Sequence, residues 1–149
     1  SNKNELNNSN IMSNYYYIEN FKQEINIRRG QSKFRKDVLN NFSYKCAISG
    51  IKESDLLRAS HIIPWSHNKH TRGDFRNGIS LYVEFDLLFD LGYFSIQNNL
   101  EIMISPISNT FSSEIRKKLS SIDGIKIRNP KRELNIKYLE YHRNIILRK

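Results

Sequence analysis

The chain has 149 residues, and its 24 lysines and arginines outnumber its 15 aspartates and glutamates, which gives a formal net charge of +9. This length fits one domain that can bury a hydrophobic core without needing disulfides or metal ions to hold it together. The single cysteine, Cys46, excludes an internal disulfide and a Cys-x-x-Cys zinc site. No apolar run approaches the roughly 20 residues that cross a bilayer, and no secretory signal opens the chain. We therefore expect a cytoplasmic protein without a membrane span, and the positive charge favours nucleic acid as partner.

The first third of the chain predicts a tail followed by a helix. Residues 1–14 are rich in Asn and Ser, so we expect them to be disordered. Residues 15–27 predict an irregular or helical lead-in, and residues 31–42 predict a helix with one apolar and one basic stripe. We therefore expect a single folded domain over residues 15–149. The chain begins with Ser rather than Met, which is compatible with the C-terminal domain of a longer protein.

The middle of the chain predicts a strand, a loop and a helix. Two short apolar segments, 44–49 and 56–63, flank a turn-forming stretch and predict a β-hairpin that ends near His61. Pro64 ends the second strand of this hairpin, and a polar loop follows. Residues 83–91 carry apolar side chains at helical spacing, which predicts a short helix ending at Gly92.

The last third predicts a second hairpin and two helices. Residues 93–97 and 100–105 flank Asn98 and Asn99, a pair that tolerates the positive φ of a tight turn. Helical spacing predicts further helices over residues 110–120 and 136–147. Together these elements predict an α+β fold.

Three chemically active side chains gather around the predicted strand, loop and helix. Asp86 and Asp90 lie four residues apart, so both carboxylates project from one helix face, where they could share a divalent cation. His61 at the strand end could serve as a general base. Metal-assisted phosphodiester cleavage needs both functions. The alternatives are a solvated acidic helix face and a histidine that serves only as a structural hydrogen-bonding group.

In this region the sequence resembles the HNH (His-Asn-His) endonucleases, which have the ββα-metal fold, and in particular the branch found in bacterial restriction and defence systems. The resemblance runs from Arg29 to Gly92, and the tail at residues 138–143 resembles the closing segment of that branch. The motifs that carry it are Arg29-Gly30-Gln31 with Phe34-Arg35, Cys46-Ala47-Ile48-Ser49-Gly50, His61-Ile62-Ile63-Pro64, Asn77-Gly78 and Phe89-Asp90-Leu91-Gly92.

This resemblance implies a ββα-metal core with flanking helices and an additional hairpin, and it implies roles for individual residues. His61 would be the general base that activates water, and Asn77 would hold the loop and the base in place. Asp86 and Asp90 would bind the metal, although Asp86 stands where the family usually has a histidine. Ser60 stands where other branches place a further ligand, and its hydroxyl is a poor substitute. Because the two aspartates offer only oxygen ligands, they favour Mg²⁺ or Mn²⁺ over Ni²⁺ or Zn²⁺.

These features together predict a divalent-metal-dependent endonuclease that hydrolyses DNA in restriction or antiphage defence. The candidate phosphate contacts are Arg29, Arg35, Arg72 and Arg76. Either a homodimer would cut both strands, or a separate recognition domain would supply specificity. Two alternatives remain open. One is an inert nucleic-acid-binding module that lost its metal with the change at Asp86, and the other is a ribonuclease of the same fold.

Overall fold

A computed structural model describes residues 2–149, which form two compact units. The N-terminal unit comprises residues 2–33 and the C-terminal unit residues 34–149, and each is described by itself. The fold is of the α+β class, as predicted, with two antiparallel hairpins among the helices. Over residues 2–149, no helix combines the length and the apolar character that a membrane span requires.

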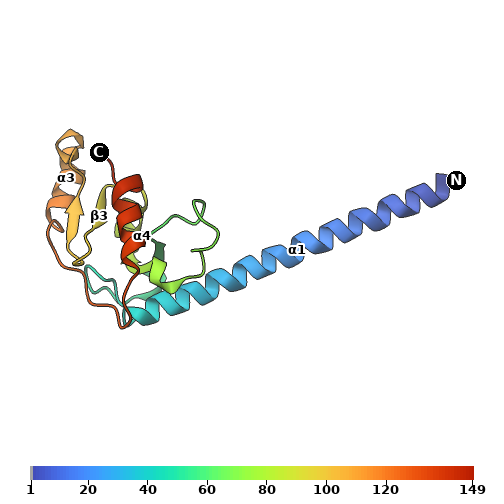
Figure 1. The fold of residues 1–149 in the computed structure, drawn as a ribbon, viewed down its shortest axis with the longest axis horizontal. Helices are drawn as coiled ribbons and strands as arrows, with labels where there is room; N and C mark the ends of the chain where they lie inside the picture. The colour runs from blue at the N-terminus through green and yellow to red at the C-terminus, as the bar shows by residue number, and fades with distance from the viewer. Residues whose placement is uncertain (1) are drawn as a thin grey trace. The chain divides into compact units, whose positions relative to one another are not determined.

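Helix α1 (Asn2–Asn41) joins segments that the sequence analysis treated separately (Figure 1). We expected residues 1–14 to be disordered, but the structure places residues 2–14 in this helix, with every side chain exposed. The irregular or helical lead-in at 15–27 belongs to the same helix. The helix continues from the packed turns at its C-terminal end through Gly30, whose cost in a helix is about 1 kcal/mol, and residues 2–29 contain no further glycine and no proline to end it.

The first hairpin pairs β1 (Leu57–His61) with β2 (Gly78–Tyr82). The strands are antiparallel, and His61 at the end of β1 lies opposite Gly78 at the start of β2. The prediction that β1 ends near His61 is therefore confirmed. Its predicted partner was wrong, because the second strand lies beyond the loop of residues 62–77 rather than before β1.

Residues 44–49, predicted as a strand, instead form turns. The Cys46 amide donates to the carbonyl of Ile51 (2.8 Å), which closes a local turn. The Ala47 amide donates to the carbonyl of Ser80 (2.8 Å). The segment therefore contacts β2 through this hydrogen bond and does not pair with it as a strand. The chain can turn here because Tyr44 adopts a positive φ of 57°.

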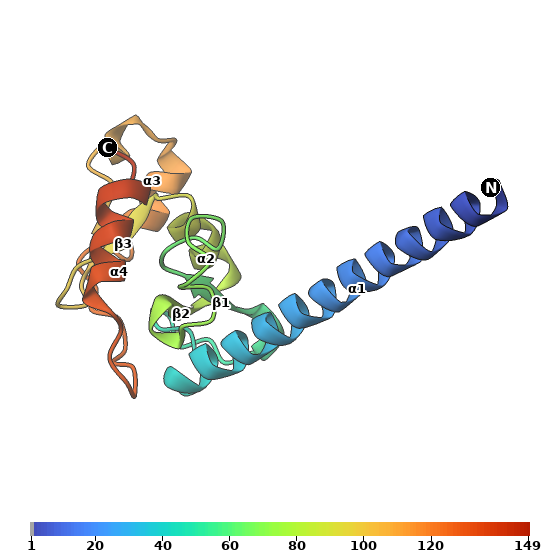
Figure 2. The same cartoon turned by 45° about the vertical axis from the view of Figure 1, so that its right-hand side comes forward.

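Helix α2 (Val83–Asp90) follows β2 directly and packs against both strands, which completes a ββα unit (Figure 2). The helix ends where the sequence predicted. Gly92 has a φ of +77°, and a Cβ there would overlap the carbonyl of Ile146. This position therefore needs glycine for its conformation and for the close approach of the C-terminal segment.

The second hairpin consists of β3 (Phe94–Ile96) and β4 (Ile102–Ile104), and it is confirmed. Positive φ occurs at Leu100 (71°) rather than at the two asparagines of the turn. A 3-10 turn at Ser108–Thr110 precedes α3 (Ser113–Ser120), so the third helix is shorter than predicted. The chain closes with α4 (Ile136–Tyr141), which continues as a π-helical segment, His142–Ile146.

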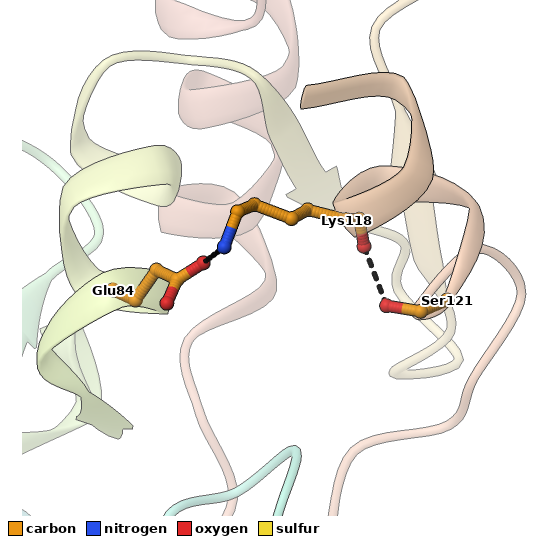
Figure 3. Close-up of polar contacts among 3 residues, drawn as sticks. All are labelled: Glu84, Lys118 and Ser121. Carbon is orange, nitrogen blue, oxygen red and sulfur yellow. Dashed lines mark hydrogen bonds and ion pairs between the residues drawn. The ribbon is translucent and has the colours of Figure 1, made fainter. Parts of the chain in front are cut away.

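A polar contact ties α2 to α3 in the C-terminal unit (Figure 3). Lys118 of α3 forms an ion pair with Glu84 of α2, and this carboxylate raises the pKa of Lys118. The hydroxyl of Ser121 donates to the carbonyl of Lys118 (2.6 Å) at the end of α3. Both side chains of the ion pair are substantially exposed, so its contribution to stability is small.

The core of the C-terminal unit unites both hairpins, α2 and the last turns of α1. Leu57, Ile79 and Phe94 are fully buried within it. Helix α1 approaches the first hairpin closely at Gly78, where a Cβ would overlap the side chains of Val38 and Phe34. This glycine lets residues 34–41 pack directly on the strand that follows the loop.

Candidate active site

His61 lies at the end of β1, with its imidazole held from two sides. Its Nε2 is 2.9 Å from the carbonyl oxygen of Arg72. A carbonyl can only accept, so Nε2 carries the hydrogen, and Nδ1 of the neutral ring keeps a free lone pair. The ring stacks on Phe34, with centroids 4.0 Å apart and an interplanar angle of 9°. The imidazole is therefore fixed in tautomer and orientation.

Burial lowers the pKa of His61 below its ordinary value. The hydrogen bond to Arg72 and the charges of Asp86 and Asp90 oppose this effect, but burial is larger. The histidine is therefore neutral at neutral pH, which is the form that accepts a proton.

Asp86 and Asp90 lie one turn apart on α2, and both act electrostatically on His61. The structure therefore brings together the strand-end histidine and the two carboxylates. Burial raises the pKa of Asp86, and the nearby charge of Asp90 raises it further. Ser60, Arg58 and the histidine act in the opposite direction.

Ser60 precedes the histidine, and its hydroxyl is buried in contact with the acidic site. It lies near enough to Asp86 to lower the pKa of that carboxylate. Within residues 2–149, however, this Oγ makes no hydrogen bond of good geometry. Burying a hydroxyl whose contact with a carboxylate is poorly aligned costs free energy, which a further polar group at the site could recover.

The donor set fits a magnesium-type ion better than a closed zinc site. Across residues 2–149, no three His, Cys, Asp or Glu side chains gather closely enough to enclose a metal ion. A structural zinc site needs four such ligands, whereas Mg²⁺ is usually held by one or two carboxylates together with waters and substrate phosphates. Asp86 and Asp90, with the unsatisfied hydroxyl of Ser60 beside them, match the second pattern.

Asn77 is fully buried and fastens the loop between β1 and β2. Its Oδ1 accepts from the amide of Ile63 (2.8 Å), and its Nδ2 donates to the carbonyls of Ile63 (3.1 Å) and Thr71 (3.4 Å). One side chain thus connects both ends of the loop to its middle. Thr71 is next to Arg72, whose carbonyl holds the imidazole of His61, so Asn77 supports that contact indirectly.

The four predicted phosphate contacts have different surroundings. Arg72 is engaged with Trp65: its Nε donates to the Trp65 carbonyl (2.7 Å), and its guanidinium lies 3.4 Å from the ring centroid. Arg76 is exposed in the same loop. Arg35 donates to the carbonyls of Ser54 and Leu57, both at 2.7 Å, so its guanidinium clamps the start of β1. Arg29 belongs to the N-terminal unit.

The sequence analysis missed one cation at the site, Arg58. This residue is exposed on β1, and its charge lowers the pKa of Asp86. It lies two residues before Ser60, and side chains two apart in a strand share a face. That alternation is the signal in the sequence that could have placed it beside the carboxylates.

Comparisons with known proteins agree with this geometry. Residues 46–97 match the family model described as HNH endonuclease. The resemblance predicted from the sequence is confirmed for this segment. The HNH segment contains the four predicted catalytic and metal-binding residues, His61, Asn77, Asp86 and Asp90, whereas Phe34, which stacks on the histidine, lies outside it.

One solved structure with a similar fold is a modification-dependent TagI restriction endonuclease. The two chains share 22% sequence identity with a TM-score of 0.53, over 74% of this chain and 36% of the other. The present chain thus spans about a third of the length of that protein. No curated protein sequence matches the chain.

Proposed function

We propose that this protein is an HNH endonuclease that hydrolyses DNA phosphodiester bonds with the help of a divalent metal ion. The observation that carries the proposal is the arrangement of His61: a neutral imidazole, held by the Arg72 carbonyl, beside the carboxylates of α2. A fixed base next to two carboxylates is the set that metal-assisted hydrolysis requires.

In this proposal, His61 removes the proton from the attacking water through Nδ1. The Arg72 carbonyl keeps the hydrogen on Nε2, so that the lone pair is always on the nitrogen that faces the reaction. Asp86 and Asp90 favour the imidazolium that forms, because their charges raise the pKa of the ring. Asn77 holds the loop that supplies the carbonyl, which makes it a positioning residue rather than a group that touches the substrate.

Asp86 and Asp90 are the residues that would hold the ion, with Mg²⁺ or Mn²⁺ ahead of Ni²⁺ or Zn²⁺ because the donors are oxygens. When bound, such an ion neutralises charge on the phosphate and on the departing oxygen. The raised pKa of Asp86 supports this assignment, because a nearby cation would favour the ionised form that burial disfavours.

Observations other than the geometry of His61 support DNA as the substrate and restriction or antiphage defence as the role. The net charge of +9 favours a polyanion, and Arg76 and Arg58 are exposed cations in the loop and at the carboxylates. The solved structure of similar fold bears the name of a modification-dependent restriction endonuclease. Since this chain spans about a third of that protein, a separate recognition domain is part of the proposal.

The test is a cleavage assay on supercoiled plasmid, linear DNA and RNA, each with Mg²⁺, Mn²⁺, Ni²⁺, Zn²⁺ or EDTA. We expect nicking of DNA in Mg²⁺ or Mn²⁺ and none in EDTA. Binding to DNA without cleavage in any metal would favour the inert module, and cleavage of RNA alone would favour the ribonuclease.

The metal assignment is tested with carboxylate variants on one helix. Asp86→Asn and Asp90→Asn should weaken Mn²⁺ binding in calorimetry and reduce nicking, whereas Glu84→Gln should leave both unchanged because Glu84 pairs with Lys118 instead (Figure 3). Asp86→His should shift the preference towards Ni²⁺ or Zn²⁺, which imidazole suits better. Equal metal affinity in wild type and both asparagine variants would remove these residues from the metal site.

A further inference from the structure

The N-terminal unit presents an apolar stripe along one face of α1. Its members lie 0, 4, 7, 10 and 14 positions along the helix, so at about 100° per residue they fall within roughly a third of the circumference. They are Ile11, Tyr15, Ile18, Phe21 and Ile25. Ile11 is 64% exposed, Ile18 50% and Phe21 56%. Soluble monomers rarely expose a contiguous apolar stripe of this kind, which indicates a contact surface.

The spacing along the stripe is that of a coiled coil. Ile11, Ile18 and Ile25 recur every seven residues, and Phe21 falls at the intermediate core position. Between residues 11 and 25 every a position is isoleucine. A β-branched residue at a is typical of parallel two-stranded coiled coils, in which leucine usually fills the d position that Phe21 fills here. Asn14 and Arg28 occupy the core positions one heptad before and one heptad after Phe21. The apolar part of the seam is therefore confined to residues 11–25, and the polar residues that flank Phe21 select one register at some cost in stability.

Charges beside the stripe are complementary in the same register. Glu24 occupies a g position and Arg29 the next e position, so in a parallel pair the glutamate of each copy faces the arginine of the other. Neither side chain forms an ion pair within residues 2–149. An antiparallel pair packs a positions against d positions, so Ile18 would face Phe21 and Glu24 would lie near residues 15–17, where no opposite charge is available.

The stripe is large enough for a specific dimer. An aromatic side chain buries about 150–250 Å² in full, and Tyr15 is 63% and Phe21 56% exposed before association. These side chains of two copies can therefore still bury on the order of 400–600 Å². The isoleucines of both copies, about half exposed, bring the total towards the lower end of the range of about 1,200–2,000 Å² that stable interfaces bury.

We infer that residues 11–29 bind a second copy of this chain as a parallel two-stranded coiled coil, with Ile11, Ile18 and Ile25 in the seam. The partner is the chain itself because its heptad spacing and its g and e charges complement each other in one register. The assembly holds two HNH segments, and this inference does not depend on their activity.

The first test is sedimentation velocity of the full chain, without DNA, over a range of concentrations. We expect a dimer whose dissociation constant rises at least about 100-fold in Ile18→Glu, because a charge replaces a buried isoleucine. Tyr16→Glu is the matched control: it lies on the same helix outside the stripe and is 70% exposed, and it should leave the dissociation constant unchanged. A wild-type monomer at every concentration would overturn the inference.

Charge exchange tests the pairing without disturbing the seam. Glu24→Lys and Arg29→Glu should each weaken the homodimer, since each places like charges opposite one another. An equimolar mixture of the two variants should recover association, because every new charge then faces an opposite one. Absence of recovery in the mixture would overturn the assigned register.

Orientation is tested by cross-linking. Asn14→Cys should form a disulfide between two copies on oxidation, because a parallel pair places the two residues 14 side by side, whereas Tyr16→Cys on the outer face should not. The natural Cys46 is buried and is common to both variants. Equal cross-linking of the two variants would contradict the parallel seam.

Discussion

Two regions of the C-terminal unit hold a histidine in nearly the same local geometry. At the end of β1, the ring of His61 stacks on Phe34 at 4.0 Å, and its Nε2 bonds a backbone carbonyl at 2.9 Å. In the π-helical segment, the ring of His142 stacks on Phe89 at 3.9 Å, and its Nε2 bonds the Phe89 carbonyl at 2.9 Å. Stacking and a carbonyl acceptor therefore do not by themselves make a histidine reactive.

The difference lies at the second nitrogen. Nδ1 of His142 is 2.7 Å from the hydroxyl of Ser95, and the side chain is 1% exposed, so both nitrogens are satisfied inside the core. Nδ1 of His61 has no hydrogen-bond partner within residues 2–149, and its ring is near the two carboxylates of α2. The imidazole of His142 is therefore structural, with both nitrogens hydrogen-bonded, whereas Nδ1 of His61 is available to a water or a substrate.

The largest expected effect is the loss of activity on removal of the His61 imidazole. His61→Ala should reduce metal-dependent DNA cleavage by about 100- to 10,000-fold, the usual contribution of a general base. The control is His70→Ala, which removes an exposed imidazole from the adjacent loop. The measurement is the nicking rate at fixed metal concentration, with thermal unfolding to show that both variants fold. Cleavage by His61→Ala at the wild-type rate would exclude the histidine as base.

The second effect falls on stability instead of activity. His142→Ala should lower the free energy of unfolding by about 3 kcal/mol, because it leaves a cavity and deprives the buried Ser95 hydroxyl and Phe89 carbonyl of their partner. Urea unfolding measures this loss. The nicking rate per folded molecule should stay within a few-fold of wild type, and a loss as large as that of His61→Ala would mean that the two regions are not distinct in function.

The third effect is the pH dependence that His142 gives to stability. Burial lowers the pKa of His142 to about 4, from an ordinary value of 6.5. Below pH 6.5 the unfolded chain therefore binds a proton at this histidine, whereas the folded chain binds it only below about pH 4. The free energy of unfolding is therefore highest above pH 6.5 and falls as the pH decreases towards 4. At about 1.4 kcal/mol per pH unit over the roughly 2.5 units between the two pKa values, the loss of stability is about 3.5 kcal/mol.

Comparison of wild type with His142→Gln isolates this contribution. The lowered pKa of His61 acts in the same direction and the raised pKa of Asp86 in the opposite one, and both are present in the two proteins. Urea unfolding at pH 7 and pH 4.5 should show a smaller difference in the variant. Identical pH dependence would show that His142 is not the group that loses its proton on folding.

The local parts of this fold could be predicted from the sequence. The end of β1 near His61, the helix that ends before Gly92 and the second hairpin follow from apolar periodicity and from stop signals within a few residues. The partner of β1 could not be found in this way. β2 lies across a long loop and continues directly into α2, so no turn residue separates the strand from the helix.

In the candidate site, too, local features could be predicted from the sequence and long-range contacts could not. The spacing of Asp86 and Asp90 predicts a shared helix face, and the structure brings both near His61. Arg35 shows the limit, because its two carbonyl partners lie 19 and 22 residues away in the sequence. A basic residue that clamps the backbone and one that faces solvent look alike until the chain has folded.

The smallest expected effect tests whether the ring beneath His61 contributes to its reactivity. Phe34→Leu keeps an apolar side chain against Gly78 but removes the parallel stack on the imidazole. An aromatic pair is worth about 0.5–1.5 kcal/mol beyond its buried area, so looser positioning of the base should lower kcat about 3- to 10-fold with little change in KM. Phe42→Leu is the matched control, since Phe42 is also buried near the end of the same helix and stacks on no histidine. Both variants should lose about 1 kcal/mol of stability, and an equal kcat in the two would show that Phe34 serves only the core.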